Sequence, residues 1–140
     1  MSAEKNSNIK FQPTYSSLLV NALNDVLEKL EADEQHSAWK SLKALYSILP
    51  PPCLTECKKL FEQKNAELTI LWQPYQKSGY DIEWAAKKHN AKLWKFYEVA
   101  NYAVTRMFID SLYLHGYLEQ TWNPLSSGDF KKIEEGESEQ

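Results

Sequence analysis

The amino-acid sequence predicts an all-α protein: a four-helix bundle-like single domain with a long C-terminal helix. Apolar residues recur at spacings of three and four in four separate segments, as they do on the inner face of amphipathic helices. Prolines and short polar runs separate these segments. Only four glycines occur in the 140 residues, which leaves few of the turn residues that a many-stranded protein needs.

Composition divides the chain into three parts. Residues 1–13 are polar and end at Pro13, so we predict a flexible N-terminal arm. Residues 14–122 form the predicted helical bundle domain, and residues 123–140 form an acidic tail that we expect to be disordered. Much of the acid lies in this tail, so the predicted domain is closer to neutral than the net charge of −3 suggests.

The first two helices are predicted over residues 14–34 and 36–49. Thr14, Ser16 and Ser17 are possible N-caps of the first helix, because their side-chain oxygens can accept free backbone N–H groups. Its predicted inner face holds Leu19, Leu23, Val26, Leu27 and Leu30. The second helix ends at three prolines, residues 50–52, since proline has no N–H to donate and its ring clashes with the preceding turn.

The third helix is predicted over residues 54–72 and ends at Gln73 and Pro74 for the same reason. Asp81 is a good N-cap for the last helix, which we predict to run to about Gly116 or Gln120. That is roughly 35 residues, or on the order of 50 Å. This helix would be longer than its partners, so we expect part of it to overhang or to pair with another chain.

The apolar run at residues 102–118 could in principle be a membrane span. A span needs roughly 20 apolar residues with few charges, and Arg106 and Asp110 interrupt this run. We therefore expect a buried core helix and no membrane contact. At about 100° per residue, ten residues of this helix fall in one core-facing sector of about 120°. They are Leu93, Phe96, Tyr97, Ala100, Ala103, Val104, Met107, Ser111, Leu114 and Leu118.

A second apolar strip lies beside this core stripe and comprises Trp94, Asn101, Phe108 and Leu112. A helix that is apolar on more than one face is central in its bundle or buried in an oligomer. We therefore predict a homodimer with this strip in its interface. The alternative is that the N-terminal arm or the segment around Trp122 covers the strip.

The remaining face of the predicted helix carries basic and tyrosine side chains within a sector of about 80°. We call this set the basic stripe, and it comprises Lys88, Lys92, Lys95, Tyr102, Arg106, Tyr113 and Tyr117. Tyr and Arg are enriched at protein-interface hot spots, and lysines with stacking rings also suit nucleic acid. The stripe could equally be a solvated face on which Arg106 and Asp110 form an ordinary i,i+4 pair.

No arrangement of residues in the sequence indicates catalysis, a metal site or a cofactor. Cys53 and Cys57 lack the spacing of a CxxC redox pair, and we expect them to be small core residues. Asp33 and His36 have the acid-x-x-His spacing of a carboxylate metal site, but no second copy exists. We therefore interpret His36 as a solvated residue between the first two helices.

These observations predict a cytoplasmic, non-enzymatic protein that binds another macromolecule as a homodimer. The N-terminal residues lack the apolar core of a secretory signal, and two cysteines do not make a disulfide scaffold. A protein partner is favoured. The alternative is a nucleic-acid-associated regulator that uses the basic stripe, and a metal- or small-molecule-dependent bundle enzyme is the third and weakest possibility.

Overall fold

Four helices and a short helical segment at 86–88 make up the part of the chain that the computed structural model describes, residues 17–78, 86–88 and 90–119. Helices account for 86% of these residues, and no strand occurs among them, so the predicted all-α class is confirmed. No helix within these ranges is both long and apolar enough to cross a membrane. The predicted N-terminal arm, the segment around Trp122 and the acidic tail lie outside the described residues.

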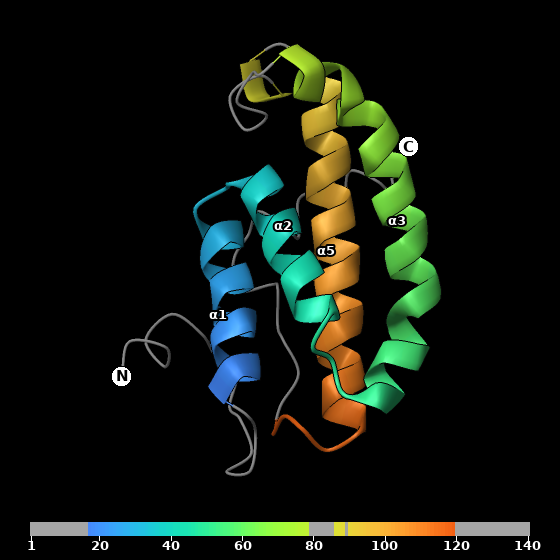
Figure 1. The fold of residues 1–140 in the computed structure, drawn as a ribbon. Coiled ribbons are helices and arrows are strands. Elements are labelled where there is room, and N and C mark those ends of the chain that lie inside the picture. The colour runs from blue at the N-terminus through green and yellow to red at the C-terminus, as the bar shows by residue number, and fades with distance from the viewer. Residues whose placement is uncertain (1–16, 79–85, 89, 120–140) are drawn as a thin grey trace, which may run out of the picture.

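Helices α1 (Ser17–Glu31) and α2 (Gln35–Tyr46) form an antiparallel pair (Figure 1). The chain leaves α1 through Asp33, whose φ of 59° places it in the left-handed region. The Asp33 N–H donates to the Leu30 carbonyl and the Glu34 N–H to the Lys29 carbonyl, which satisfies two free carbonyls at the helix end. On the opposing faces, Ser41 donates a hydrogen bond to Asp25 and ties α2 to α1.

Helix α3 (Pro51–Ser78) differs from its prediction at both ends. It starts three residues early, because a proline at the first helical position needs no hydrogen bond for its missing N–H. It also continues through Pro74 instead of ending there. The carbonyl that Pro74 leaves without a backbone donor belongs to Ile70, and Ile70 is 68% exposed, so water can satisfy it.

Helix α5 (Ala91–Leu114) is shorter than the predicted last helix. It begins after Asn90, whose side-chain oxygen accepts a hydrogen bond from the Leu93 N–H at 3.0 Å. Its last residue is Leu114, and the chain turns at Gly116, which has a φ of +84°. Beyond this turn the Tyr117 N–H donates a hydrogen bond to the Leu112 carbonyl. Helix α3, with 28 residues, is therefore the longest described helix, so the overhang expected of the last helix is wrong.

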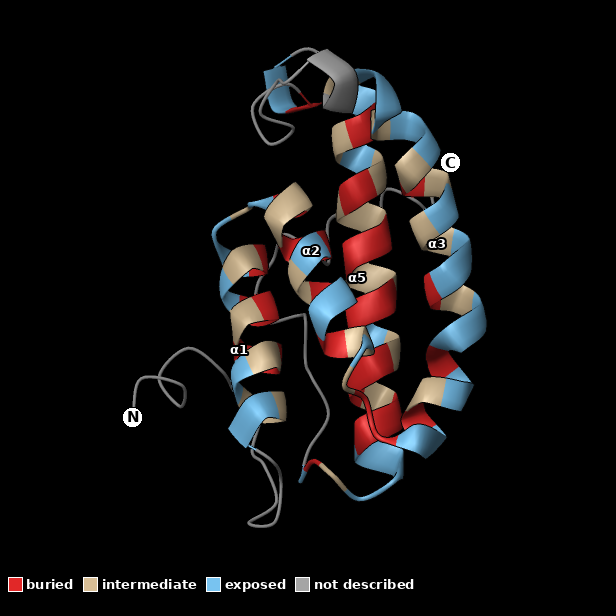
Figure 2. Cartoon of the chain, in the orientation of Figure 1, coloured by how far each residue is buried: buried red, intermediate tan, exposed pale blue. Residues whose placement is uncertain are grey.

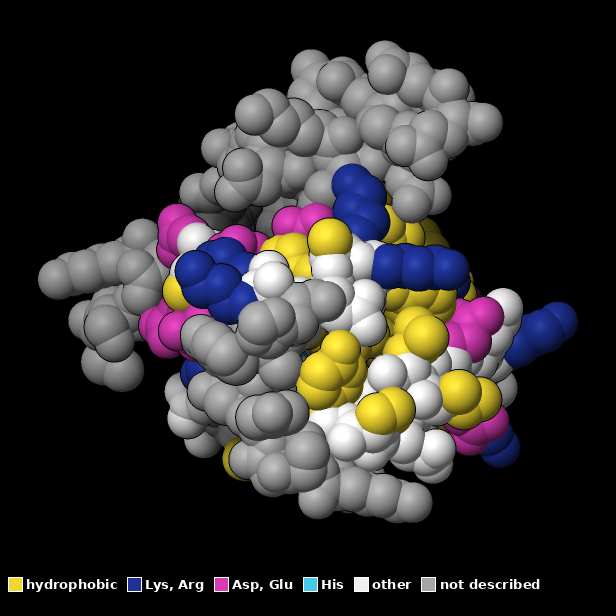
Figure 3. Space-filling model, turned by 90° about the horizontal axis from the view of Figure 1, so that it is seen from above, with side chains coloured by type: hydrophobic (Ala, Val, Ile, Leu, Met, Phe, Trp, Pro, Cys, Tyr) yellow, Lys and Arg dark blue, Asp and Glu magenta, His cyan; other side chains and the backbone are white. Residues whose placement is uncertain are grey.

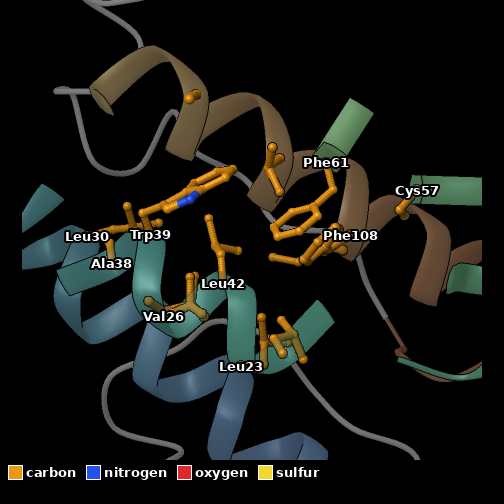
Figure 4. Close-up of a cluster of buried hydrophobic side chains, with 14 of the residues drawn as sticks. Leu23, Val26, Leu30, Ala38, Trp39, Leu42, Cys57, Phe61 and Phe108 are labelled. Atoms are coloured by element: carbon orange, nitrogen blue, oxygen red, sulfur yellow. The ribbon is translucent and has the colours of Figure 1, made fainter. Parts of the chain in front are cut away.

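The helices lie in the order α1, α2, α5, α3, and α5 packs against both α2 and α3 (Figure 1). Buried residues accordingly follow α5 along its length (Figure 2). Side chains of all four helices meet in the core, where Phe61 of α3 stacks on Tyr46 and Trp39 of α2 and approaches Phe108 of α5 (Figure 4).

The predicted core stripe of the last helix is confirmed at six of its positions and displaced at the others. The six buried residues are Leu93, Tyr97, Ala100, Val104, Ser111 and Leu118. Phe96, Ala103 and Met107 are only half-buried, and Leu114 is 72% exposed. The inward face of α5 is thus rotated from the prediction toward Asn101, Phe108 and Leu112, and the first two of these contact α2.

Candidate binding face of helix α5

The apolar strip predicted for a dimer interface lies inside the single chain. Asn101, Phe108 and Leu112 are each at most 1% exposed, and Trp94 is half-buried. The Asn101 side-chain NH₂ donates to the backbone and side-chain oxygens of Gln35, at 2.9 and 2.7 Å. The centre of the Phe108 ring lies 6.1 Å from that of Tyr46, which belongs to α2 like Gln35.

Helix α2 therefore contacts this strip at Asn101 and Phe108. The burial of Asn101, Phe108 and Leu112 within the chain corrects their interpretation as surface residues awaiting a second chain. A helix that is apolar on two faces needs two neighbours, and α5 has both within its own chain. The homodimer itself stays a prediction, but it no longer has these residues as its interface.

Five residues of the predicted basic stripe share the outward face of α5. Lys92, Lys95 and Arg106 are exposed, Tyr113 is 43% exposed and Tyr102 is half-buried. The other two stripe residues, Lys88 and Tyr117, lie outside α5 and so do not share this face. Lys88 belongs to the helical segment before the Asn90 cap, and Tyr117 follows the turn at Gly116.

Arg106 is held by two neighbours on its own helix. Its guanidinium donates to the Tyr102 hydroxyl at 2.9 Å and lies 3.8 Å from the Asp110 carboxylate. The Arg106 and Asp110 side chains are 47% and 46% exposed, so solvent screens the pair and its contribution to stability is small. This part of the stripe thus contains the i,i+4 pair expected of a solvated face.

Lys92 and Lys95 differ from Arg106 in lacking a counter-charge. Neither makes an ion pair within the described part of the chain, whereas the nearby Lys87 pairs with Asp33 at 3.6 Å. Lysines in the first turns of a helix oppose its macrodipole, and α5 has no acid in its first turn. These two lysines therefore do not stabilise the helix that carries them. Viewed from above, basic side chains at this end lie beside hydrophobic surface (Figure 3).

His36 is not the solvated residue that the sequence predicts. It is half-buried, its Nδ1 lies 2.7 Å from the Tyr97 hydroxyl, and its ring meets the rings of Tyr97 and Trp72 edge-on. The residues of this contact come from three helices and lie far apart in sequence. No local pattern in the sequence could have indicated it.

The two cysteines are core residues, as predicted. Both side chains are fully buried, and burial raises the pKa of the Cys57 thiol to about 11 and also raises that of Cys53. A thiol that stays protonated at neutral pH is a poor nucleophile and a poor metal ligand. Across the described ranges, no three His, Cys, Asp or Glu side chains are grouped so that they could hold a metal ion.

A polar contact joins the start of α3 to the end of α5, and no pattern in the sequence indicates it. Buried Ser111 donates to Glu56 at 2.5 Å, and His115 Nε2 lies 3.4 Å from the same carboxylate oxygen. Glu56 belongs to α3 and Ser111 to α5, so this hydrogen bond ties the two helices together. We assign this contact to helix packing.

Searches of family models, curated proteins and solved structures find no match to this chain.

Proposed function

We propose that this protein is a non-enzymatic binding module that holds a protein partner against the outward face of α5. The observation that supports this proposal is the pair Lys92 and Lys95, which are exposed, unpaired among the described residues and unfavourable for their own helix. Arg106 and Tyr113 extend the same face toward the end of α5. Arg and Tyr are among the residues that contribute most to protein interfaces.

A protein partner is favoured over a nucleic acid because the face is mixed in charge. Asp110 lies beside Arg106, and phosphates would approach both. Strong binding to nucleic acid depends on many lysine and arginine contacts to phosphate. Of the three cations on α5, only Lys92 and Lys95 form no ion pair with a described residue, and two are too few for a phosphate-binding surface.

The test is affinity capture from native lysate with the wild type and two charge-reversed variants. Lys92→Glu with Lys95→Glu changes the proposed face, and Lys58→Glu with Lys59→Glu makes the same charge change at exposed positions on α3. We expect the first variant to lose the captured protein and the second to keep it. Equal capture by all three forms would refute the proposal.

A second measurement separates the protein partner from the nucleic-acid alternative. Tyr113→Ala should weaken binding of the captured protein by about 1–2 kcal/mol, since Tyr113 would lie inside the interface. If a nucleic acid is captured instead, its affinity should fall steeply with salt, because each neutralised phosphate releases counterions.

Two further properties belong to the same proposal. We place the protein in the cytoplasm, because two free, buried cysteines suit a reducing compartment. The homodimer can be measured by sedimentation equilibrium, and a single species of one chain mass at micromolar concentration would exclude it.

A further inference from the structure

Half-buried apolar side chains follow the line where α3 and α5 meet. Phe96, Val99 and Met107 of α5 lie on one ridge, because they are spaced by three and eight residues along the helix. Leu60 of α3 is half-buried too. We call these four residues the α3–α5 seam.

Two contacts establish that the two helices border this seam. Lys64 of α3 places its Nζ 5.4 Å from the centre of the Phe96 ring. The Cys57 thiol of α3 lies 3.8 Å from the Met107 carbonyl. The four seam residues pack against the core but are only half-buried, so each keeps part of its apolar surface open to solvent.

The charges along the seam are of two kinds. Lys64 is 3.7 Å from Glu67, and Arg106 is 3.8 Å from Asp110, so each of these cations has its own acid. Lys92 and Lys95 have none within the described ranges. Lys92 is four residues before Phe96, and Lys95 is four residues before Val99, so each unpaired lysine stands directly beside a seam residue.

We infer that the α3–α5 seam docks an amphipathic helix of the partner protein, with its apolar face on the seam and its acidic residues against Lys92 and Lys95. This inference rests on the proposed function and adds the chemistry of the partner. An amphipathic helix binds such a surface through apolar residues at positions i, i+3, i+4 and i+7. Its ridges pack between those of α3 and α5.

The electrostatics of α5 support an acidic partner. Lys92 and Lys95 lie near the N-terminus of the helix, where the macrodipole is positive as well. Partner carboxylates at this end would meet two lysines and the favourable end of the dipole. A nucleic acid fits the surface less well, because its phosphates gain nothing from the apolar seam and would approach Glu67 and Asp110.

The probe is a fluorescein-labelled synthetic helix with leucines at i, i+3, i+4 and i+7 and glutamates at its flanking positions. A matched probe keeps the leucines and replaces every glutamate by lysine. Fluorescence anisotropy measures the binding of both probes to the full chain. We expect the acidic probe to bind at least about tenfold more tightly than the basic one.

Charge reversal in the protein gives the decisive comparison. Lys92→Glu with Lys95→Glu should weaken the acidic probe by about tenfold and strengthen the basic probe. Lys58→Glu with Lys59→Glu should leave both affinities unchanged. Val99→Asp should weaken the acidic probe as well, and circular dichroism with thermal melting establishes that each variant is folded.

Two results would overturn the inference. One is equal affinity of the acidic and basic probes for the wild type. The other is an equal response of the acidic probe to both charge-reversed variants. If the captured protein still requires Lys92 and Lys95, the proposed function stands while this inference fails. If neither probe nor captured protein depends on these lysines, both fail.

Discussion

Replacing Phe108 by alanine tests whether this residue is core or interface. Phe108 is 1% exposed, and its ring centre lies 6.1 Å from the ring centres of Tyr46 and of Phe61. Removing a buried phenylalanine side chain costs about 3–5 kcal/mol, because the transfer free energy is lost and a cavity remains. Phe61 keeps its stacking on Tyr46 at 4.0 Å, so part of the cluster can close around the gap. We expect a loss of about 4 kcal/mol.

The assay is urea unfolding followed by far-ultraviolet circular dichroism, repeated at two protein concentrations that differ about a hundredfold. The stability of a monomer does not depend on protein concentration, whereas that of an obligate dimer does. Leu114→Ala is the matched control on the same helix, and as Leu114 is 72% exposed its loss should stay within about 0.5 kcal/mol. A loss below about 1 kcal/mol for Phe108→Ala, or one that changes with concentration, would refute the assignment to the core.

Three further changes have expected outcomes. Asn101→Ala leaves the buried Gln35 side chain without its donor and should lower the free energy of unfolding by about 1–3 kcal/mol in urea. Burial raises the pKa of Cys57 from its ordinary 9.0 to about 11 in the folded state. The contribution of this thiol to the free energy of unfolding should therefore be constant below pH 9.0 and should decrease as the pH rises from 9.0 to about 11. In the Cys57→Ala variant, the free energy of unfolding should decrease less over that range. Burial alone would raise the pKa of Asp25, but hydrogen bonds, including one from Ser41, outweigh it and hold the pKa below its ordinary value. Ser41→Ala should therefore raise the pKa of Asp25, measured by NMR titration, and lower the free energy of unfolding at neutral pH. At a pH where the carboxyl is protonated, the variant and the wild type should be equally stable. An unchanged Asp25 pKa would contradict the reasoning.

The number and positions of the long helices could be predicted because the signals are local. The apolar spacing that marks α1 and α2 reflects which side of each helix is buried, and that spacing is written in the segment itself. Helix ends were predicted less well. Pro74 does not end α3, because the effect of a proline depends on whether water reaches the carbonyl one turn earlier, and the sequence does not contain that information.

The candidate face could be predicted only in part, for a similar reason. Lys92, Lys95 and Arg106 fall on one face because they share one helix. The predicted basic stripe includes Lys88 because it assumes an unbroken helix, but α5 begins only after its cap at Asn90. The neighbours of α5 could not be predicted at all, because the contacts of Asn101 with Gln35 and of His36 with Tyr97 join residues far apart in the chain.

The central position of α5 has a consequence for synthesis of the chain. Helices α1 and α2 are neighbours in sequence and in space, so they can pair soon after they leave the ribosome. Helix α3 has its main partner in α5, which is made last of the four. Until residue 114 has emerged, Phe61 lacks its neighbour Phe108, and we expect a nascent chain stopped before Ala91 to expose α3 to proteases and chaperones. Stalled nascent chains of increasing length, digested with protease, should become resistant only when all of α5 is outside the exit tunnel.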